Sequence, residues 1–169
     1  TYKDLLDSKP ITRNSGVLGQ AAQRRALARF NGVAYPDTDA DTDLDLDGNS
    51  DSNVEALIMD GKFKFLPTNL NEIFKNLVRI EVMNSKLEKI KKENFNGLNL
   101  EVLKLSKNRL KTIDSDALEG QHSLIKISLD RNKIETLPDK IFSFTTQLET
   151  LRLENNNLKV LSENLLQNL

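Results

Sequence analysis

A leucine pattern that recurs every 24 residues limits what this chain can fold into more than any other feature. The pattern reads L-x-x-L-x-L-x-x-N-x-L-x-x-L, with Ile at some of the Leu positions. It occurs three times in succession, at residues 100–113, 124–137 and 148–161. The asparagines of the three copies are Asn108, Asn132 and Asn156. Such a period is typical of repeat proteins whose units stack on one another.

The spacing inside each copy predicts a short strand that cannot bury its apolar face alone. Within L-x-x-L-x-L the apolar residues alternate, so that Leu103 and Leu105 point to the same side of a strand. Stacked units bury such residues in one continuous core and pair their strands as a parallel ladder. The chain has to turn after each strand, inside the stack, and an Asn amide can satisfy the backbone groups that the turn leaves unpaired. We therefore predict that the asparagines form a structural ladder and not a binding site.

Two less regular copies precede these three, one beginning at Val54 and one spanning residues 77–90. With the F-x-x-L spacing at residues 74–77 and 95–98, the chain resembles the typical 24-residue class of leucine-rich-repeat (LRR) proteins. Its first repeats are similar to those of small secreted LRR proteins of insects. The resemblance covers residues 49–169, about five units. It implies an α/β solenoid, an arc with short parallel β-strands on the concave face and irregular or 3-10 segments on the convex face.

Residues 1–48 differ from the repeats, and we expect a short N-terminal helix followed by an Asp-rich linker. An Asn-Ser-Gly sequence at residues 14–16 can begin a helix over residues 17–30, and an Asn-Gly pair at residues 31–32 can end it. Because terminal repeats need a cap, the preferred interpretation is a helix that covers the open edge of the first repeat. A basic amphipathic helix that binds a membrane or a partner is the alternative.

Aspartate occupies every second position from Asp37 to Asp47. Carboxylates this close repel one another, which predicts an extended acidic linker. The same segment matches D-x-D-x-D-G-x-x-D, a pattern of Ca²⁺-binding loops, which need hard oxygen ligands two residues apart and a Gly for the turn. The ligands would be Asp43, Asp45, Asp47 and Asp51. Val54 stands where an EF-hand has its bidentate Glu, so the linker is the preferred interpretation and a Ca²⁺-dependent module is the alternative.

The composition argues against several other classes of protein. A net charge of −1 gives no electrostatic footprint for nucleic acid or for an anionic membrane. No apolar run approaches the roughly 18 residues that a membrane span needs. The chain has no cysteine, which excludes disulfides and a Cys nucleophile. The first residues also lack the apolar stretch of a signal peptide. The family resemblance, in contrast, implies an extracellular, secreted protein.

The resemblance places the variable strand positions on the concave face and implies that they bind another protein. The residues expected to contact this partner are Ile58, Arg79, Glu81, Met83, Lys104, Lys126, Ser128, Asp130, Arg152 and Glu154. Opposite charges on neighbouring strands, Glu81 beside Lys104 and Arg152 near Asp130, can pair across the ladder. No catalytic motif, phosphate loop or paired metal-binding histidine is present in the sequence. We expect a non-catalytic recognition module without a cofactor, and a structural spacer within a larger LRR chain is a further alternative.

Overall fold

The structure is a computed structural model that describes residues 26–32 and 54–167. Its helices and strands are β1 (Ala26–Gly32), β2 (Val54–Gly61), α2 (Leu70–Ile73), β3 (Arg79–Val82), β4 (Lys89–Ile90), η1 (Lys92–Asn94), β5 (Val102–Lys104), β6 (Thr112–Ile113), β7 (Lys126–Ser128) and β8 (Thr150–Arg152). The predicted Asp-rich linker, its candidate Ca²⁺ ligands and residues 17–25 of the predicted helix lie outside the described residues.

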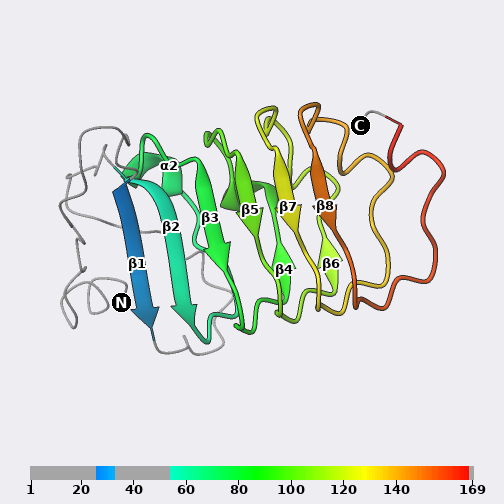
Figure 1. Cartoon of the computed structure of the whole chain (residues 1–169), viewed down its shortest axis with the longest axis horizontal. Helices are drawn as coiled ribbons and strands as arrows, with labels where there is room; N and C mark the ends of the chain where they lie inside the picture. Colours follow the sequence, from blue (N-terminus) through cyan, green and yellow to red (C-terminus); the bar gives the residue numbers. More distant parts are fainter. Residues whose placement is uncertain (1–25, 33–53, 168–169) are drawn as a thin grey trace.

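Among the described residues, six strands form one parallel sheet along the long axis of the molecule, in the order β1-β2-β3-β5-β7-β8 (Figure 1). Within this sheet, each strand from β2 onward lies at the start of one copy of the leucine pattern, so neighbouring strands belong to neighbouring repeats. In register, Ile80 lies opposite Leu103, Leu103 opposite Ile127, and Ile127 opposite Leu151. The chain therefore winds as a parallel β-solenoid, as the leucine pattern predicts.

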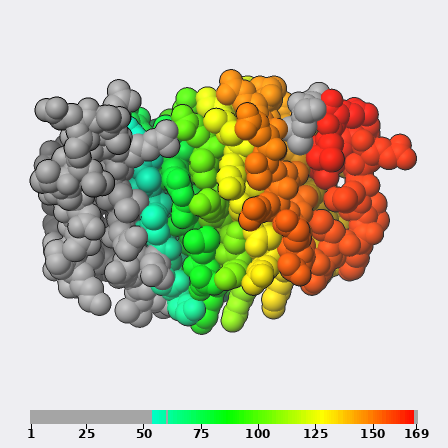
Figure 2. Space-filling view, in the orientation of Figure 1, coloured from blue at the N-terminus to red at the C-terminus, as the bar shows by residue number. Residues whose placement is uncertain are grey.

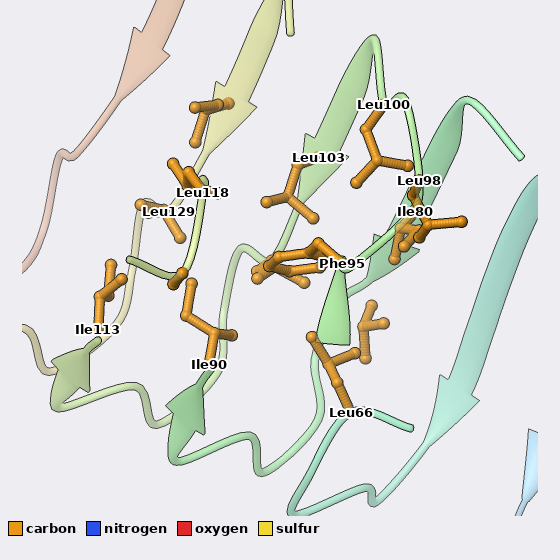
Figure 3. Close-up of a cluster of buried hydrophobic side chains, with 14 of the residues drawn as sticks. Leu66, Ile80, Ile90, Phe95, Leu98, Leu100, Leu103, Ile113, Leu118 and Leu129 are labelled. Carbon is orange, nitrogen blue, oxygen red and sulfur yellow. The ribbon is translucent and has the colours of Figure 1, made fainter. Parts of the chain in front are cut away.

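The pattern residues of successive repeats share one hydrophobic core beneath the sheet (Figure 3). Leu103 and Leu105, predicted to share one side of a strand, both have an exposed fraction of 0%. Phe95, on the segment that leads into β5, belongs to the same cluster and is also buried. Burying one such side chain stabilises the fold by roughly 1.5–3 kcal/mol. Stacking of repeats is therefore the main source of stability, because no unit encloses these side chains alone.

The asparagines of the pattern form the predicted structural ladder, in which each side chain joins two repeats. The Oδ1 atom of Asn132 accepts a hydrogen bond from the backbone N–H of Leu110 at 3.1 Å. Its Nδ2 atom donates to the carbonyl of Leu105 in the preceding repeat at 2.9 Å. The other two asparagines repeat this arrangement. In the less regular second copy, Ser85 takes the place of Asn, because its hydroxyl both accepts from the N–H of Phe63 and donates to the same residue's carbonyl.

The segments that connect one strand to the next complete each turn of the solenoid. They contain α2, the 3-10 helix η1, and the strands β4 and β6, which pair as a second parallel sheet. Two buried amide side chains link successive connections. Asn94 donates to the carbonyl of Leu66, and Gln121 donates to the carbonyls of Phe95 and Leu98, each at 3.0 Å. Neighbouring repeats are thus hydrogen-bonded through their connections as well as through their strands.

The predicted N-terminal helix is wrong over residues 26–30. These residues belong to β1, which pairs with β2 in parallel, and the Asn-Gly pair predicted to end the helix lies in the same strand. The prediction rested on local propensity and cap residues, which contribute a fraction of a kcal/mol per residue. The first strand of a stack instead presents a row of unpaired backbone N–H and C=O groups that another strand can satisfy. This long-range pairing outweighs the local preference.

The last described repeat differs from the others in the burial of its pattern residues. Leu161 and Leu166 have exposed fractions of 56% and 54%. Leu137 and Phe142, which occupy the same positions one repeat earlier, have exposed fractions of 8% and 1%. Figure 2 shows the repeats as successive bands, with the final one at the end of the stack. Burial of these positions therefore depends on the repeat that follows.

Candidate recognition surface

Side chains that alternate with the buried leucines form one surface, which we call the strand face. Ile80, Leu103 and Ile127 point into the core, so their neighbours in sequence point away from it. The strand face of β3 to β8 consists of Arg79, Glu81, Met83, Val102, Lys104, Ser106, Lys126, Ser128, Asp130, Thr150, Arg152 and Glu154, and Ile58 continues it onto β2. The sheet register therefore places the predicted contact residues of the strands on one continuous surface, and Met83, Asp130 and Glu154 lie just after the strands. Glu81 and Ser128 are buried within it, with exposed fractions of 6% and 4%.

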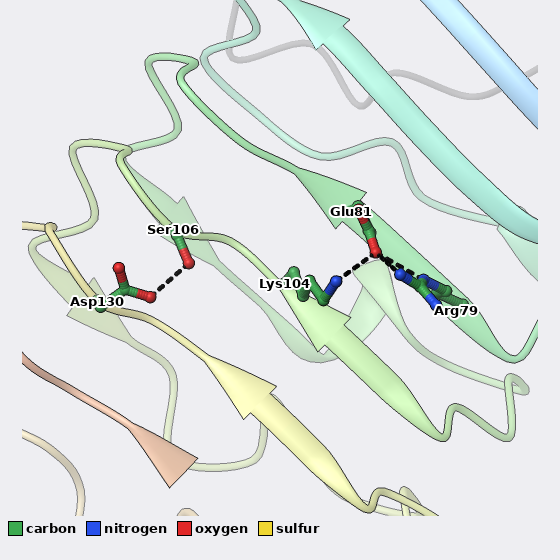
Figure 4. A network of polar contacts seen from close by, with 5 residues as sticks. All are labelled: Arg79, Glu81, Lys104, Ser106 and Asp130. Carbon is green, nitrogen blue, oxygen red and sulfur yellow. Dashed lines mark hydrogen bonds and ion pairs between the residues drawn. The ribbon is translucent and has the colours of Figure 1, made fainter. Parts of the chain in front are cut away.

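Glu81 is the centre of a charged cluster on this face (Figure 4). Its Oε1 atom accepts a hydrogen bond from Arg79 Nε at 2.6 Å and a second from Arg79 Nη2, and it lies 2.8 Å from Lys104 Nζ. Burial raises the pKa of Glu81, but the hydrogen bonds from Lys104 and Arg79 outweigh burial and hold the pKa below its ordinary value. Glu81 is therefore a carboxylate at neutral pH, and its charge is balanced within the protein.

The predicted pairing of Glu81 with Lys104 is confirmed, whereas Arg79 was not predicted to join it. The signal was present, because residues two apart in a strand share a face. The predicted pairing of Arg152 with Asp130 is wrong. Asp130 instead accepts a hydrogen bond from Ser106 at 2.5 Å, and these two residues lie one repeat apart on neighbouring turns (Figure 4).

Three charged side chains of the strand face form neither an ion pair nor a side-chain hydrogen bond among the described residues, whereas Asp130 is held by Ser106. They are Lys126, Arg152 and Glu154. Arg152 and Glu154 are exposed and Lys126 is half-buried, so all three reach solvent. Met83, with an exposed fraction of 38%, is the large apolar side chain that the same face offers. The β7–β8 end of the strand face thus carries charged side chains that form no ion pair within the described part of the fold.

Two further features are absent from the described part of the chain. Residues 26–32 and 54–167 hold no group of three or more His, Cys, Asp or Glu side chains that could bind a metal ion. Within these ranges, no helix has the length and apolarity to cross a membrane. The Ca²⁺ site at Asp43, Asp45, Asp47 and Asp51 lies elsewhere in the sequence and stays a prediction.

Comparisons with known proteins agree with this architecture. A family profile described as leucine-rich repeat matches residues 75–134 and, in an overlapping second match, residues 122–169. A search of curated proteins finds no match. Among solved structures, a chain of the Toll–Spatzle complex, described as a molecular hub in Drosophila development and innate immunity, is similar with a TM-score of 0.59 and 26% sequence identity. The similarity covers 69% of this chain and 19% of that chain, so this chain spans only a small part of its structural relative's length.

Proposed function

The chain belongs to the leucine-rich-repeat family, and we propose from this premise that it is a non-catalytic recognition module whose strand face binds another protein. The family's fold is a general protein-interaction fold. The proposal rests on the contrast between the two sets of side chains that alternate along each strand. One set of side chains is apolar and holds the repeats together in the core. The alternating set, from Arg79 to Glu154, shares one surface outside the hydrophobic core, where only the short or paired side chains of Glu81, Ser106 and Ser128 are buried.

The strand face is well suited to binding because its backbone is fixed before a partner arrives. Sheet pairing and the asparagine ladder hold each repeat to the next. Glu81 in turn holds the side chains of Arg79 and Lys104 in place. A surface that is ordered in the free protein loses less conformational entropy on association, which favours affinity. We assign partner contact to Ile58, Arg79, Glu81, Met83, Lys104, Lys126, Ser128, Asp130, Arg152 and Glu154.

We place this activity outside the cell, in a secreted protein similar to those of insects. Two observations support this part of the proposal. The 24-residue period with its F-x-x-L spacing resembles the typical LRR class, and the similar solved structure is that of Toll in a complex with Spatzle. That structure supports the proposal that the partner is a protein. The side chains of this chain's own strand face would select among proteins.

Because the chain contains no cysteine, a single introduced cysteine gives a direct test. Met83→Cys, labelled with a polyethylene-glycol maleimide, places a bulky neutral chain on the strand face. Ser115→Cys with the same label is the matched control, because Ser115 is an exposed residue two positions after β6 and off the strand face. Both labelled proteins, and the unlabelled chain, serve as baits for proteins of the source's extracellular fluid.

We expect a protein that the unlabelled bait and the Ser115→Cys bait retain and that the Met83→Cys bait loses. If the same proteins bind all three baits, the strand face is not the binding surface, and the structural-spacer interpretation replaces the proposal. Thermal melts of the labelled proteins show whether each is folded, so that loss of capture is not confused with loss of structure.

A further inference from the structure

Basic side chains outnumber acidic ones on the strand face of β3 to β8 and on the turn that follows each strand. The turn residues share a left-handed backbone, with φ of 56° at Lys107 and 55° at Arg131. The basic residues of this surface are Arg79, Lys104, Lys107, Lys126, Arg131 and Arg152, and the acidic ones are Glu81, Asp130 and Glu154. Glu101 and Glu149 lie one residue before β5 and β8 and are not part of the strand face as defined above. The excess is local, because the whole chain has a net charge of −1.

The basic residues differ in whether they already form an ion pair within the protein. Arg79 and Lys104 are both bound to Glu81, so an incoming anion would have to compete with a buried carboxylate. Lys126 and Arg152, in contrast, form no ion pair among the described residues. An anion that approaches them replaces only water. An acidic group therefore binds most favourably at the β7–β8 end of the strand face.

The register brings these two cations close together, with the hydroxyl group of Thr150 on the same face. Lys126 lies opposite Thr150, and Ser128 lies opposite Arg152. The two cations are thus on neighbouring strands and two residues apart along the strand, which separates their Cα atoms by roughly 8 Å. This spacing lets both side chains reach one acidic segment. The half-buried hydroxyl of Thr150 can donate to the same segment, whereas Ser128 is buried, with an exposed fraction of 4%.

We propose that the β7–β8 end of the strand face binds an acidic segment of a partner protein, with Lys126 and Arg152 as the contact cations. The inference rests on the proposed function and adds the chemistry of the partner. A protein segment fits better than nucleic acid or an anionic membrane, because Asp130 and Glu154 lie beside the cations and repel a continuous polyanion. A protein can place its carboxylates over the cations and other groups over the acids.

The test uses the full chain and a fluorescent peptide of alternating Glu and Gly, with the Gln–Gly peptide as the uncharged control. Binding is followed by fluorescence anisotropy. The variant Lys126→Glu/Arg152→Glu reverses the contact cations. Lys75→Glu/Lys140→Glu makes the same change in net charge at two exposed lysines that lie off the strand face. A single-stranded oligothymidylate serves as the polyanion probe.

We expect the Glu peptide, and not the Gln peptide, to bind the native chain and the Lys75→Glu/Lys140→Glu control equally well. Lys126→Glu/Arg152→Glu should weaken this binding by about tenfold or more, since each reversal replaces an attraction by a repulsion. Affinity should also fall when the ionic strength rises from roughly 0.01 to 0.15 M, which shortens the Debye length from about 30 to about 8 Å.

Equal affinity of both double variants for the Glu peptide, or no binding of that peptide at low ionic strength, overturns the inference. If oligothymidylate binds more tightly than the peptide and loses affinity in the Lys126→Glu/Arg152→Glu variant, the surface is a polyanion site and the inference is also wrong. These failures leave the proposed function intact if the neutral label at Met83→Cys still blocks capture of a partner. If that label has no effect, the proposed function itself fails.

Discussion

Replacing Asn132 by Ala removes four hydrogen bonds from the middle of the asparagine ladder, one of them a donation to the carbonyl of Asp130 at 3.3 Å. The side chain accepts from the N–H of Leu110 at 3.1 Å and donates to the carbonyls of Leu105 and Leu129 at 2.9 Å each. Leu105 keeps a partner, because Asn108 also donates to its carbonyl, and Leu129 keeps Asn156 in the same way. The N–H of Leu110, in a residue with an exposed fraction of 0%, therefore loses the side-chain acceptor that the ladder gives it.

These contacts set the size of the effect. A buried N–H that loses its acceptor costs about 1–3 kcal/mol, and each lost donation to a carbonyl that keeps another partner costs about 0.5–1 kcal/mol. We therefore expect Asn132→Ala to lower the free energy of unfolding by about 3 kcal/mol. Asn156→Ala should cost less, because Asn156 is half-buried in the last described repeat. Asn157→Ala is the control, since Asn157 is exposed and its bond to the carbonyl of Ile134 comes from its backbone N–H.

Urea unfolding followed by far-ultraviolet circular dichroism measures the three free energies. The denaturant slope should stay near that of the native chain, because none of the substitutions changes the surface that unfolding exposes. A loss below about 1 kcal/mol for Asn132→Ala would refute the reasoning. So would a loss equal to that of Asn157→Ala, because the ladder would then contribute no more than an exposed surface residue.

Three further predictions concern the carboxylate of Glu81, two glycines and the Asp-rich segment. Because the pKa of Glu81 is lowered in the fold, this carboxylate stabilises the protein above its unfolded pKa and ceases to do so as pH falls through its folded pKa. The Glu81→Gln variant should therefore be less stable than the native chain at pH 7. The difference in unfolding free energy between the two proteins should become smaller as the pH is lowered to 3. Gly97→Ala should destabilise the fold more than Gly120→Ala in the same melts. Both glycines have a positive φ, but a Cβ at Gly97 would lie 2.6 Å from Asn71 Nδ2, whereas a Cβ at Gly120 meets nothing within 4 Å. Millimolar Ca²⁺ should leave the melting temperature unchanged if residues 43–51 are a linker, and an increase that Asp45→Asn abolishes would establish the Ca²⁺ site instead.

The sequence by itself determined the solenoid and the part of the surface that follows from register. A 24-residue period with alternating leucines fixes which residues are buried, and it places each residue opposite the one a repeat away. The asparagine ladder and the contact of Glu81 with Lys104 were predictable for this reason. Both depend only on spacing along the chain, which the strand geometry converts directly into neighbours in space.

Only the tertiary structure decided which of several adjacent groups pair and what lies at the first edge of the sheet. Asp130 has both Ser106 and Arg152 within its neighbourhood in register, and side-chain geometry selects Ser106. Glu81 gains Arg79 as a second partner by the same competition. The strand at Ala26–Gly32 depends on an unpaired edge contributed by β2, which lies more than twenty residues further along the chain. Local propensity contains no information about such an edge, because the row of unpaired backbone groups on β2 forms only when the repeats stack.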